Sequence, residues 1–339
     1  MLNKNGENTI VFSNSPRIRG FASVAGKTEG KGPLGKEFDV IFEDEYSGED
    51  TFEQAESRLV EAAVETLLKK TDIPADEVDI LFAGDLLNQC AGSTFGAENF
   101  GIPHVGVYGA CSTMALSLGL AAVFVDAGYA KNALAVTSSH FCASERQFRL
   151  PLEYGGQRTG SAQWTVTGSG AVMVGRDCGN IEIKSATFGR ITDYNVTDVN
   201  NMGAAMAPAA CDTIVQHFED FKTKPSDYDK IITGDLSQIG SKLLIDLLRE
   251  KKIDISDRHM DCGLEIFERK EQDVHAGGSG CGCSAVILAS YILPQIQKKI
   301  WKRVLFVPTG ALLSKISFNE GASIPGIAHA VVIEALDSF

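Results

Sequence analysis

A segment in the first half of the chain is repeated in the second half. Asp79 begins an apolar run that ends at Gly84-Asp85-Leu86, and Asp229 begins a run that ends at Gly234-Asp235-Leu236. A short apolar run that stops at a glycine is typical of a buried strand. The repeat therefore predicts equivalent strands in the two halves of the chain.

Helices are expected before both of these strands. Residues 51–70 carry apolar side chains at helical spacing, and Thr51 with Gln54 forms a capping box at their start. The matching helix of the second half is expected over residues 211–221.

A second pair of similar segments supports a duplication. Residues 170–174 (Gly-Ala-Val-Met-Val) resemble residues 284–288 (Ser-Ala-Val-Ile-Leu), and each run follows a glycine-rich stretch, so both are predicted to be strands. We expect two duplicated halves, residues 1–177 and residues 178–339. The alternation of strands and helices predicts an α/β protein in which helices cover both faces of mixed sheets around a central helix pair.

Charge limits the direct partners of the chain. Its 339 residues carry a formal net charge of −13, which repels nucleic acid and anionic lipid headgroups. One basic cluster surrounds Trp301 and consists of Lys298, Lys299, Lys302 and Arg303. We expect it to be a solvated helix end, and a docking site is the alternative.

The cysteines and the hydropathy indicate an intracellular chain. No run approaches the ~18 apolar residues of a spanning helix, and no basic segment precedes an apolar one at the start, so we expect no transmembrane segment and no secretion signal. The eight cysteines are then expected to be free thiols. Cys262, Cys281 and Cys283 lack the paired spacing of a structural zinc site, and we expect them to be buried.

Residues 106–128 predict a strand, a tight turn and a helix that is apolar nearly all round, which has to be buried. Cys111 falls in the first turn of this helix. Unpaired amides and the positive end of the helix dipole lower a thiol pKa and attract anions, so the position favours a nucleophilic cysteine or an anion-binding pocket. An inert buried thiol is the alternative.

Several segments resemble the thiolase superfamily, including its ketoacyl synthase III branch, in order and spacing. They are the strand at Ile80, Gly-Ile-Pro at 101–103, Gly-Ala-Cys-Ser-Thr at 109–113, the strand 135–140 and Gly-Ser-Gly-Ala at 168–171. The resemblance covers nearly the whole chain and implies a five-layered α-β-α-β-α fold. In the superfamily, the cysteine that matches Cys111 carries the acyl group.

The superfamily's catalytic partners are replaced in this chain. A histidine is expected after the second-half strand, where Gly234 is instead followed by Asp235, whose carboxylate would repel an oxyanion. The glycine-rich turn at 275–283 contains no asparagine. We therefore expect no catalytic residue and no enzyme activity. The alternative is an acyl-transferring condensing enzyme that uses Cys111, with His275 or His140 as its base.

Longer runs resemble one family of the superfamily, the stage V sporulation protein AD family. These runs are residues 84–90, 108–113, 138–141 with 146–149, and 306–314. The resemblance implies that the chain binds dipicolinic acid (pyridine-2,6-dicarboxylate) for uptake into the forespore and for release at germination. It implies a soluble subunit of a channel assembly, with other membrane subunits as partners and a peripheral location at the spore inner membrane. The superfamily is commonly dimeric, which implies a homodimer through the N-terminal half.

Dipicolinate is a flat ring with two carboxylates, so its site needs anion donors and an apolar slot. Backbone amides near Cys111 and on the loop 310–314 are expected to hold the carboxylates. Asp85 suits the calcium chelate of the ligand, and a helix cap is its alternative role. The predicted ligand-binding residues are Cys111, Asp85, Leu86, Asn88, Gln89, Ser112, His140, Gly310, Ala311, Leu312, Leu313 and Ser314. No cofactor and no resident metal are expected.

Overall fold

The computed structural model describes residues 4–148, 157–176 and 179–336. The predicted boundary between residues 177 and 178, and Arg149 of one family-like run, lie outside the described residues. The strands are β1 (Lys4–Asn5), β2 (Thr9–Val11), β3 (Arg17–Ala25), β4 (Val40–Ile41), β5 (Ile80–Gly84), β6 (His104–Gly106), β7 (Asn132–Ser139), β8 (Trp164–Thr165), β9 (Gly168–Gly175), β10 (Ile181–Phe188), β11 (Lys230–Thr233), β12 (His259–Asp261), β13 (Gly278–Ser279), β14 (Arg303–Val307), β15 (Thr309–Ala311) and β16 (Gly326–Ala335).

The α-helices lie between these strands and over them. They are α1 (Lys27–Gly30), α2 (Phe52–Thr71), α3 (Ala91–Ala97), α4 (Thr113–Ala127), α5 (Phe141–Phe148), α6 (Met202–Phe221), α7 (Ser237–Glu250), α8 (Cys262–Glu265), α9 (Cys281–Ile287), α10 (Leu293–Gln297) and α11 (Lys315–Asn319). The predicted helix at 51–70 and both repeated strands are confirmed. Thr51 Oγ1 accepts the Gln54 N–H at 3.2 Å, as the capping box predicts.

The large sheet repeats one strand order. Its path is β12-β11-β14-β16-β10-β3-β9-β7-β5-β6, so the order β3-β9-β7-β5-β6 of the first half matches β10-β16-β14-β11-β12 of the second. The directions also match: β5 is parallel to β6 and β7, and β11 is parallel to β12 and β14. A single antiparallel pair, Arg17 with Glu182, joins β3 to β10. The N-terminal strand β2 also pairs with β10.

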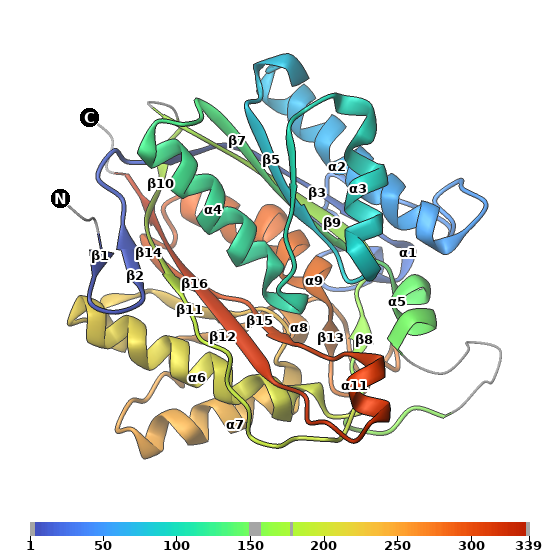
Figure 1. Ribbon diagram of the computed structural model, residues 1–339, viewed down its shortest axis with the longest axis vertical. Coiled ribbons are helices and arrows are strands. Elements are labelled where there is room, and N and C mark those ends of the chain that lie inside the picture. Colours follow the sequence, from blue (N-terminus) through green and yellow to red (C-terminus); the bar gives the residue numbers. More distant parts are fainter. Residues whose placement is uncertain (1–3, 149–156, 177–178, 337–339) are drawn as a thin grey trace.

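The layers follow from what each helix covers. Buried side chains of α2 pack on β3, β5, β7 and β9, and those of α6 and α7 pack on β11, β14 and β16. Between the two halves of the large sheet lie α4 and α9, and Figure 1 shows α2 with α3 and α6 with α7 at opposite outer faces. The five-layered thiolase-like arrangement is therefore confirmed.

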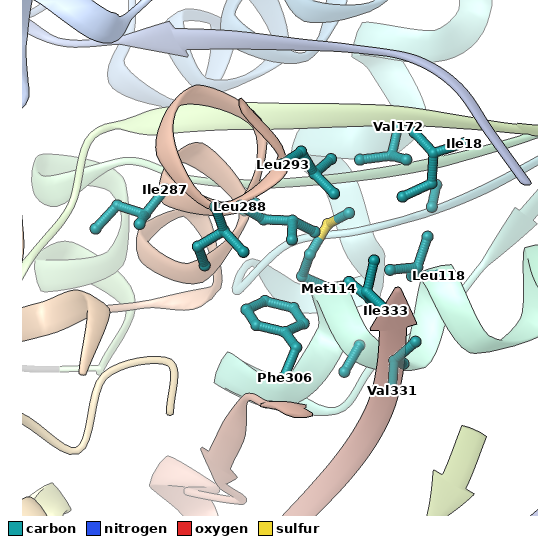
Figure 2. Packing of buried hydrophobic residues seen from close by; sticks show 14 of the residues in the cluster. Ile18, Met114, Leu118, Val172, Ile287, Leu288, Leu293, Phe306, Val331 and Ile333 are labelled. Atoms are coloured by element: carbon teal, nitrogen blue, oxygen red, sulfur yellow. The ribbon is translucent and has the colours of Figure 1, made fainter. Parts of the chain in front are cut away.

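The two central helices share one core cluster with both sheets. Figure 2 shows Met114 and Leu118 of α4 facing Phe306, Val331 and Ile333 of the second-half strands. Residues 110–127, the one described helical segment with the length and apolar composition of a membrane span, have 72% of their residues buried inside the protein. Burial on every side explains why this helix lacks a polar face.

The strand predicted at 284–288 is wrong. These residues belong to α9 and to the π turn Leu288–Ile292 that continues it. Every residue of α9 is buried, so its apolar run shows no helical period and cannot be told from a strand by pattern. By position, α9 matches α4, since each connects the edge strand of its half to the strand two places further in (β6 to β7, β12 to β14).

The helix of the second half begins earlier than expected. It starts at Met202, where the Asn201 side chain accepts the Ala204 N–H at 3.3 Å, and it contains Pro208. Gly203 and Pro208 disfavour helix, so the sequence pattern did not predict this part of α6, although the alanines around them favour helix. The early start matters because it brings the N-terminal turns of α6 to the site described below.

Candidate functional site

A rigid turn places Cys111 at the entrance to α4. Ala110 has a positive φ of 49°, and the turn Ala110–Ser112 runs directly into the helix. The Thr113 hydroxyl donates to the Ala110 carbonyl at 2.6 Å and accepts the Gly109 N–H at 3.1 Å. The Ser112 hydroxyl donates to the Gly109 carbonyl at 2.7 Å, so it stabilises the turn from within.

Strand β15 closes over this turn because residue 310 is glycine. A methyl group built at Gly310 would lie 2.1 Å from the Gly109 carbonyl oxygen and 3.0 Å from the Cys111 backbone nitrogen. Only a residue without Cβ permits this approach. The close contact brings Ala311 and Leu313 over Cys111, from the opposite half of the chain.

A pocket opens where the two halves meet at Cys111. It encloses about 600 Å³ of empty space, a figure that includes open solvent at its mouth. Its lining residues are Leu86, Tyr108, Ala110, Cys111, Ser144, Glu145, Phe148, Thr165, Val199, Met202, Met206, Ser279, Ala311 and Leu313.

The pocket combines apolar walls with a few polar groups. Leu86 and Phe148 come from the first half of the chain, and Met202 and Met206 from α6. The hydroxyl of Ser144, a residue only 3% exposed, has no hydrogen-bond partner among the residues that the structure describes. A buried donor without a partner carries a free-energy cost that a ligand acceptor would remove.

The expectation of a lowered pKa at Cys111 is wrong. Burial, and next the neighbouring Asp235 carboxyl, raise the pKa of this thiol well above its ordinary value. The Ser112 and Thr113 amides already donate to the carbonyls of Gly109 and Ala110. The helix start therefore does not offer these two amides to an anion.

The negative charge expected at Asp235 is also corrected. This side chain is fully buried, and burial raises its pKa to about 8. Its Oδ2 accepts the Gly280 N–H at 2.9 Å and contacts the Ser279 hydroxyl at 3.4 Å. At neutral pH the group is therefore mostly a neutral carboxylic acid.

Asp85 caps α3 and does not line the pocket. It is fully buried and accepts the Leu87 N–H at 2.8 Å, the Ser93 N–H at 2.6 Å and the Ser93 hydroxyl at 2.7 Å. These bonds match the capping role that the sequence left open. Its neighbour Leu86 does line the pocket.

The two histidines considered as bases lie away from the pocket lining. His140 is fully buried, its Nε2 donates to the Glu45 carbonyl at 2.8 Å, and its Nδ1 accepts the Ala143 N–H at 3.3 Å. Burial lowers the pKa of this imidazole, which is thus neutral and fully bonded. His275 is on the loop before β13, and its Nε2 lies 3.5 Å from Oδ1 of Asp273.

The other predicted residues divide between the rim and the surrounding structure. Asn88 and Gln89 are exposed and do not line the pocket. Leu312 packs on the cluster formed by Leu86, Ala110 and Cys281. Ser314 accepts the Ser317 N–H at 3.3 Å and caps α11. Of the predicted set, Cys111, Leu86, Ala311 and Leu313 line the pocket.

The pocket residues that lie far from Cys111 in the chain were not predicted from the sequence. Met202 and Met206 fell outside the helix predicted from residue 211. Ser144 and Glu145 come from α5, which follows the family-like strand ending at His140. The short pairing of β8 with β13 brings Thr165 beside Ser279, and no sequence pattern marked it.

The cysteine pair in α9 is structural. Cys281 donates to the Ser138 carbonyl at 2.9 Å, and Cys283 lies 3.5 Å from the Gly234 carbonyl. Burial raises the pKa of both thiols well above the ordinary value. Within residues 4–148, 157–176 and 179–336, no three His, Cys, Asp or Glu side chains gather as metal ligands would.

The repeated strand order and the layers define a thiolase-like fold. Solved structures with the same fold include 3-oxoacyl-[acyl-carrier-protein] synthase III from Aquifex aeolicus VF5, with a TM-score of 0.56 and 14% identity over 94% of this chain and 99% of that one. A variant of Xanthomonas campestris OleA has a TM-score of 0.61 and 13% identity over 96% of this chain and 99% of that one. At these identities the likeness shows the fold alone.

The chain belongs to the stage V sporulation protein AD family. The model of this family matches residues 6–334. The chain is 46% identical, over 329 residues, to the stage V sporulation protein AD of Bacillus subtilis (strain 168), and the match covers 97% of both chains.

Proposed function

We propose that the chain binds dipicolinic acid in the pocket at Cys111, for uptake into the forespore and release at germination. Family membership supports a role in sporulation. The observation that carries the proposal is the partnerless, buried Ser144 hydroxyl in a pocket with apolar walls. A flat aromatic dicarboxylate needs this combination: Leu86, Met202 and Met206 flank the ring, and hydroxyl donors receive the carboxylates.

We propose that the calcium chelate binds better than the free dianion. Glu145 lines the pocket, where a carboxylate repels the dianion but suits a hard cation with open coordination positions. In this role Glu145 takes the place that the sequence assigned to Asp85.

We also propose that the chain is not a condensing enzyme. Acyl transfer needs a thiolate, and the pKa of Cys111 is raised by burial and by Asp235. Among the described residues that line the pocket there is no histidine to act as base.

Calorimetry with dipicolinate, with and without calcium, tests the binding site. Ser144→Ala should weaken binding about tenfold, because one hydrogen bond to a charged acceptor is lost. Ser290→Ala is the matched control: Ser290 is also 3% exposed, its hydroxyl also has no partner, and it does not line the pocket. It should bind as the wild type does.

Two results would contradict these proposals. Equal weakening in Ser144→Ala and Ser290→Ala would place the ligand elsewhere. Silence with dipicolinate, together with a stable acyl group on Cys111 after incubation with acyl-coenzyme A, would support the condensing enzyme instead.

We propose a homodimer through the exposed edge of the first-half sheet, in a complex that lies peripherally at the spore inner membrane with other channel subunits. Strand β6 ends the sheet and all its residues are exposed. Val105 of this strand is 40% exposed, and Phe95 of α3 is 63% exposed. An open edge with apolar neighbours is suited to pairing with a second copy of the chain.

Light scattering of the purified chain tests this dimer. Val105→Lys should yield monomers, because a charge on the edge strand opposes pairing. Ile300→Lys, at another exposed apolar residue in the second half, should leave the dimer unchanged. A monomeric wild type would refute the dimer.

A further inference from the structure

The two oxygens of the Asp235 carboxyl group have unequal hydrogen-bond partners. Asp235 follows β11 and is fully buried. The Gly280 N–H and the Ser279 hydroxyl both donate to Oδ2, whereas Oδ1 has no hydrogen-bond partner within the described part of the chain. A buried carboxylate with one unpaired oxygen is costly when charged and much less so when it holds a proton.

No cation among the described residues stabilises the negative charge of Asp235; burial raises its pKa, and a hydrogen bond from the Cys111 thiol lowers it in part. The titratable groups that interact with it are Asp261 of β12, Cys111 of the turn before α4, Cys262 of α8, and Cys281 and Cys283 of α9. None of these is a cation. Asp261 accepts the Leu236 and Ser237 N–H groups and the Thr233 hydroxyl, at 2.9, 2.9 and 2.6 Å, bonds that stabilise its own charge. Two adjacent buried carboxyls with such unequal partners divide into one ionised and one protonated group.

Asp235 lies directly behind the pocket wall. Its two side-chain neighbours Cys111 and Ser279 both line the pocket. An ionised Asp235 would draw the Ser279 hydroxyl and the Cys111 thiol towards itself as donors. A protonated Asp235 can donate to Ser279, which leaves the Ser279 hydroxyl hydrogen to point into the pocket.

We infer that Asp235 is a proton-dependent positioning residue for an anionic ligand: its protonated form lets Ser279 and Cys111 donate to a ligand carboxylate, and its ionised form withdraws them and adds a repelling charge. The inference rests on the proposed binding of dipicolinate. It makes ligand binding proton-linked, so that rising pH favours release.

The pH range of this effect follows from the direction of the linkage. Burial, then the charge of Asp261, raise the pKa of Asp235 to about 8 in the free protein, and an adjacent ligand carboxylate raises it further. The competent form is therefore complete below about pH 7 and falls up to tenfold per unit above about pH 8. Both ligand carboxyls stay ionised throughout, since carboxyl groups titrate near pH 4.

Calorimetry with calcium-free dipicolinate from about pH 6.5 to about pH 9.5 tests the inference. Wild-type affinity should fall roughly 30-fold over this range. Asp235→Asn should bind at all these pH values with one affinity, because the amide is neutral throughout and does not titrate in this range. Glu29→Gln is the matched control: Glu29 is a second fully buried acid whose pKa burial raises to about 8, and it does not line the pocket. It should keep the wild-type profile.

A flat wild-type profile, or a pH-dependent one in Asp235→Asn, would overturn the inference and leave the binding proposal intact. Loss of dipicolinate binding at every pH in the wild type would instead refute the proposed function. The infrared difference spectrum between Asp235→Asn and the wild type, both without ligand and at about pH 7, measures the protonation state of Asp235 independently of binding. A missing protonated-carboxyl band in the variant supports a proton on Asp235, and identical spectra exclude it.

Discussion

Gly310→Ala should lower the free energy of unfolding by about 3 kcal/mol, at the upper end of the range for overpacking. The added methyl group would lie 2.1 Å from the Gly109 carbonyl oxygen, which is backbone and has little room to move. Strand β15 then has to separate from the Cys111 turn. Because Ala311 and Leu313 move with the strand, dipicolinate should bind more than about tenfold more weakly, which corresponds to about 1.4 kcal/mol.

Chemical denaturation of Gly310→Ala and calorimetry under native conditions provide the two measurements. Gly160→Ala is the control, because no atom lies within 4 Å of a methyl group built there and its φ is unstrained. It should change stability by less than about 0.5 kcal/mol. Unchanged stability and binding in Gly310→Ala would show that the contact between β15 and the turn is not required.

Phe306→Ala should lower the free energy of unfolding by about 4 kcal/mol. Phe306 is fully buried in β14 and packs in the central layer with Met114 of α4 and Leu288 after α9 (Figure 2). Truncation leaves a cavity where two sheets and two helices meet, and a close-packed interior fills such a space only in part.

Phe306→Ala should also change the stability of the protein without changing its affinity for the ligand. Phe306 does not line the pocket, so the folded variant should keep its affinity for dipicolinate while its denaturation midpoint falls. Ile300→Ala, at a residue 62% exposed, should leave both quantities near the wild-type values. A loss of less than about 1 kcal/mol in Phe306→Ala would mean that the central layer relaxes to fill the cavity.

The charge state of the site supports the proposal that the chain is not a condensing enzyme. Cys111 is a buried thiol with a raised pKa, and its neighbour Asp235 is an acid with a raised pKa. A neutral thiol and a neutral acid donate hydrogen bonds and do not attack a carbonyl. These protonation states support the proposed binding role.

The sequence by itself determined the elements that depend on local spacing. The repeated Asp79 and Asp229 segments predicted two equivalent strands, and the apolar helix after Cys111 predicted a buried central element. Family-like runs over nearly the whole chain predicted the layered fold. Each of these signals lies within about ten to twenty neighbouring residues, where periodicity and turn chemistry act.

Only the tertiary structure decided which residues surround the pocket and how they are charged. Met202, Ser144 and Ser279 line the pocket but come from different parts of the chain. The sequence of α9 predicts a strand, because a helix that is buried on all sides has an apolar run without helical period. Asp85 and Asp235 occupy equivalent places in the repeated sequence. One is held by three donors at a helix start, and the other has an unpaired oxygen behind the pocket. The two carboxyl groups differ because of desolvation and because of partners distant in sequence, and local sequence spacing predicts neither of these.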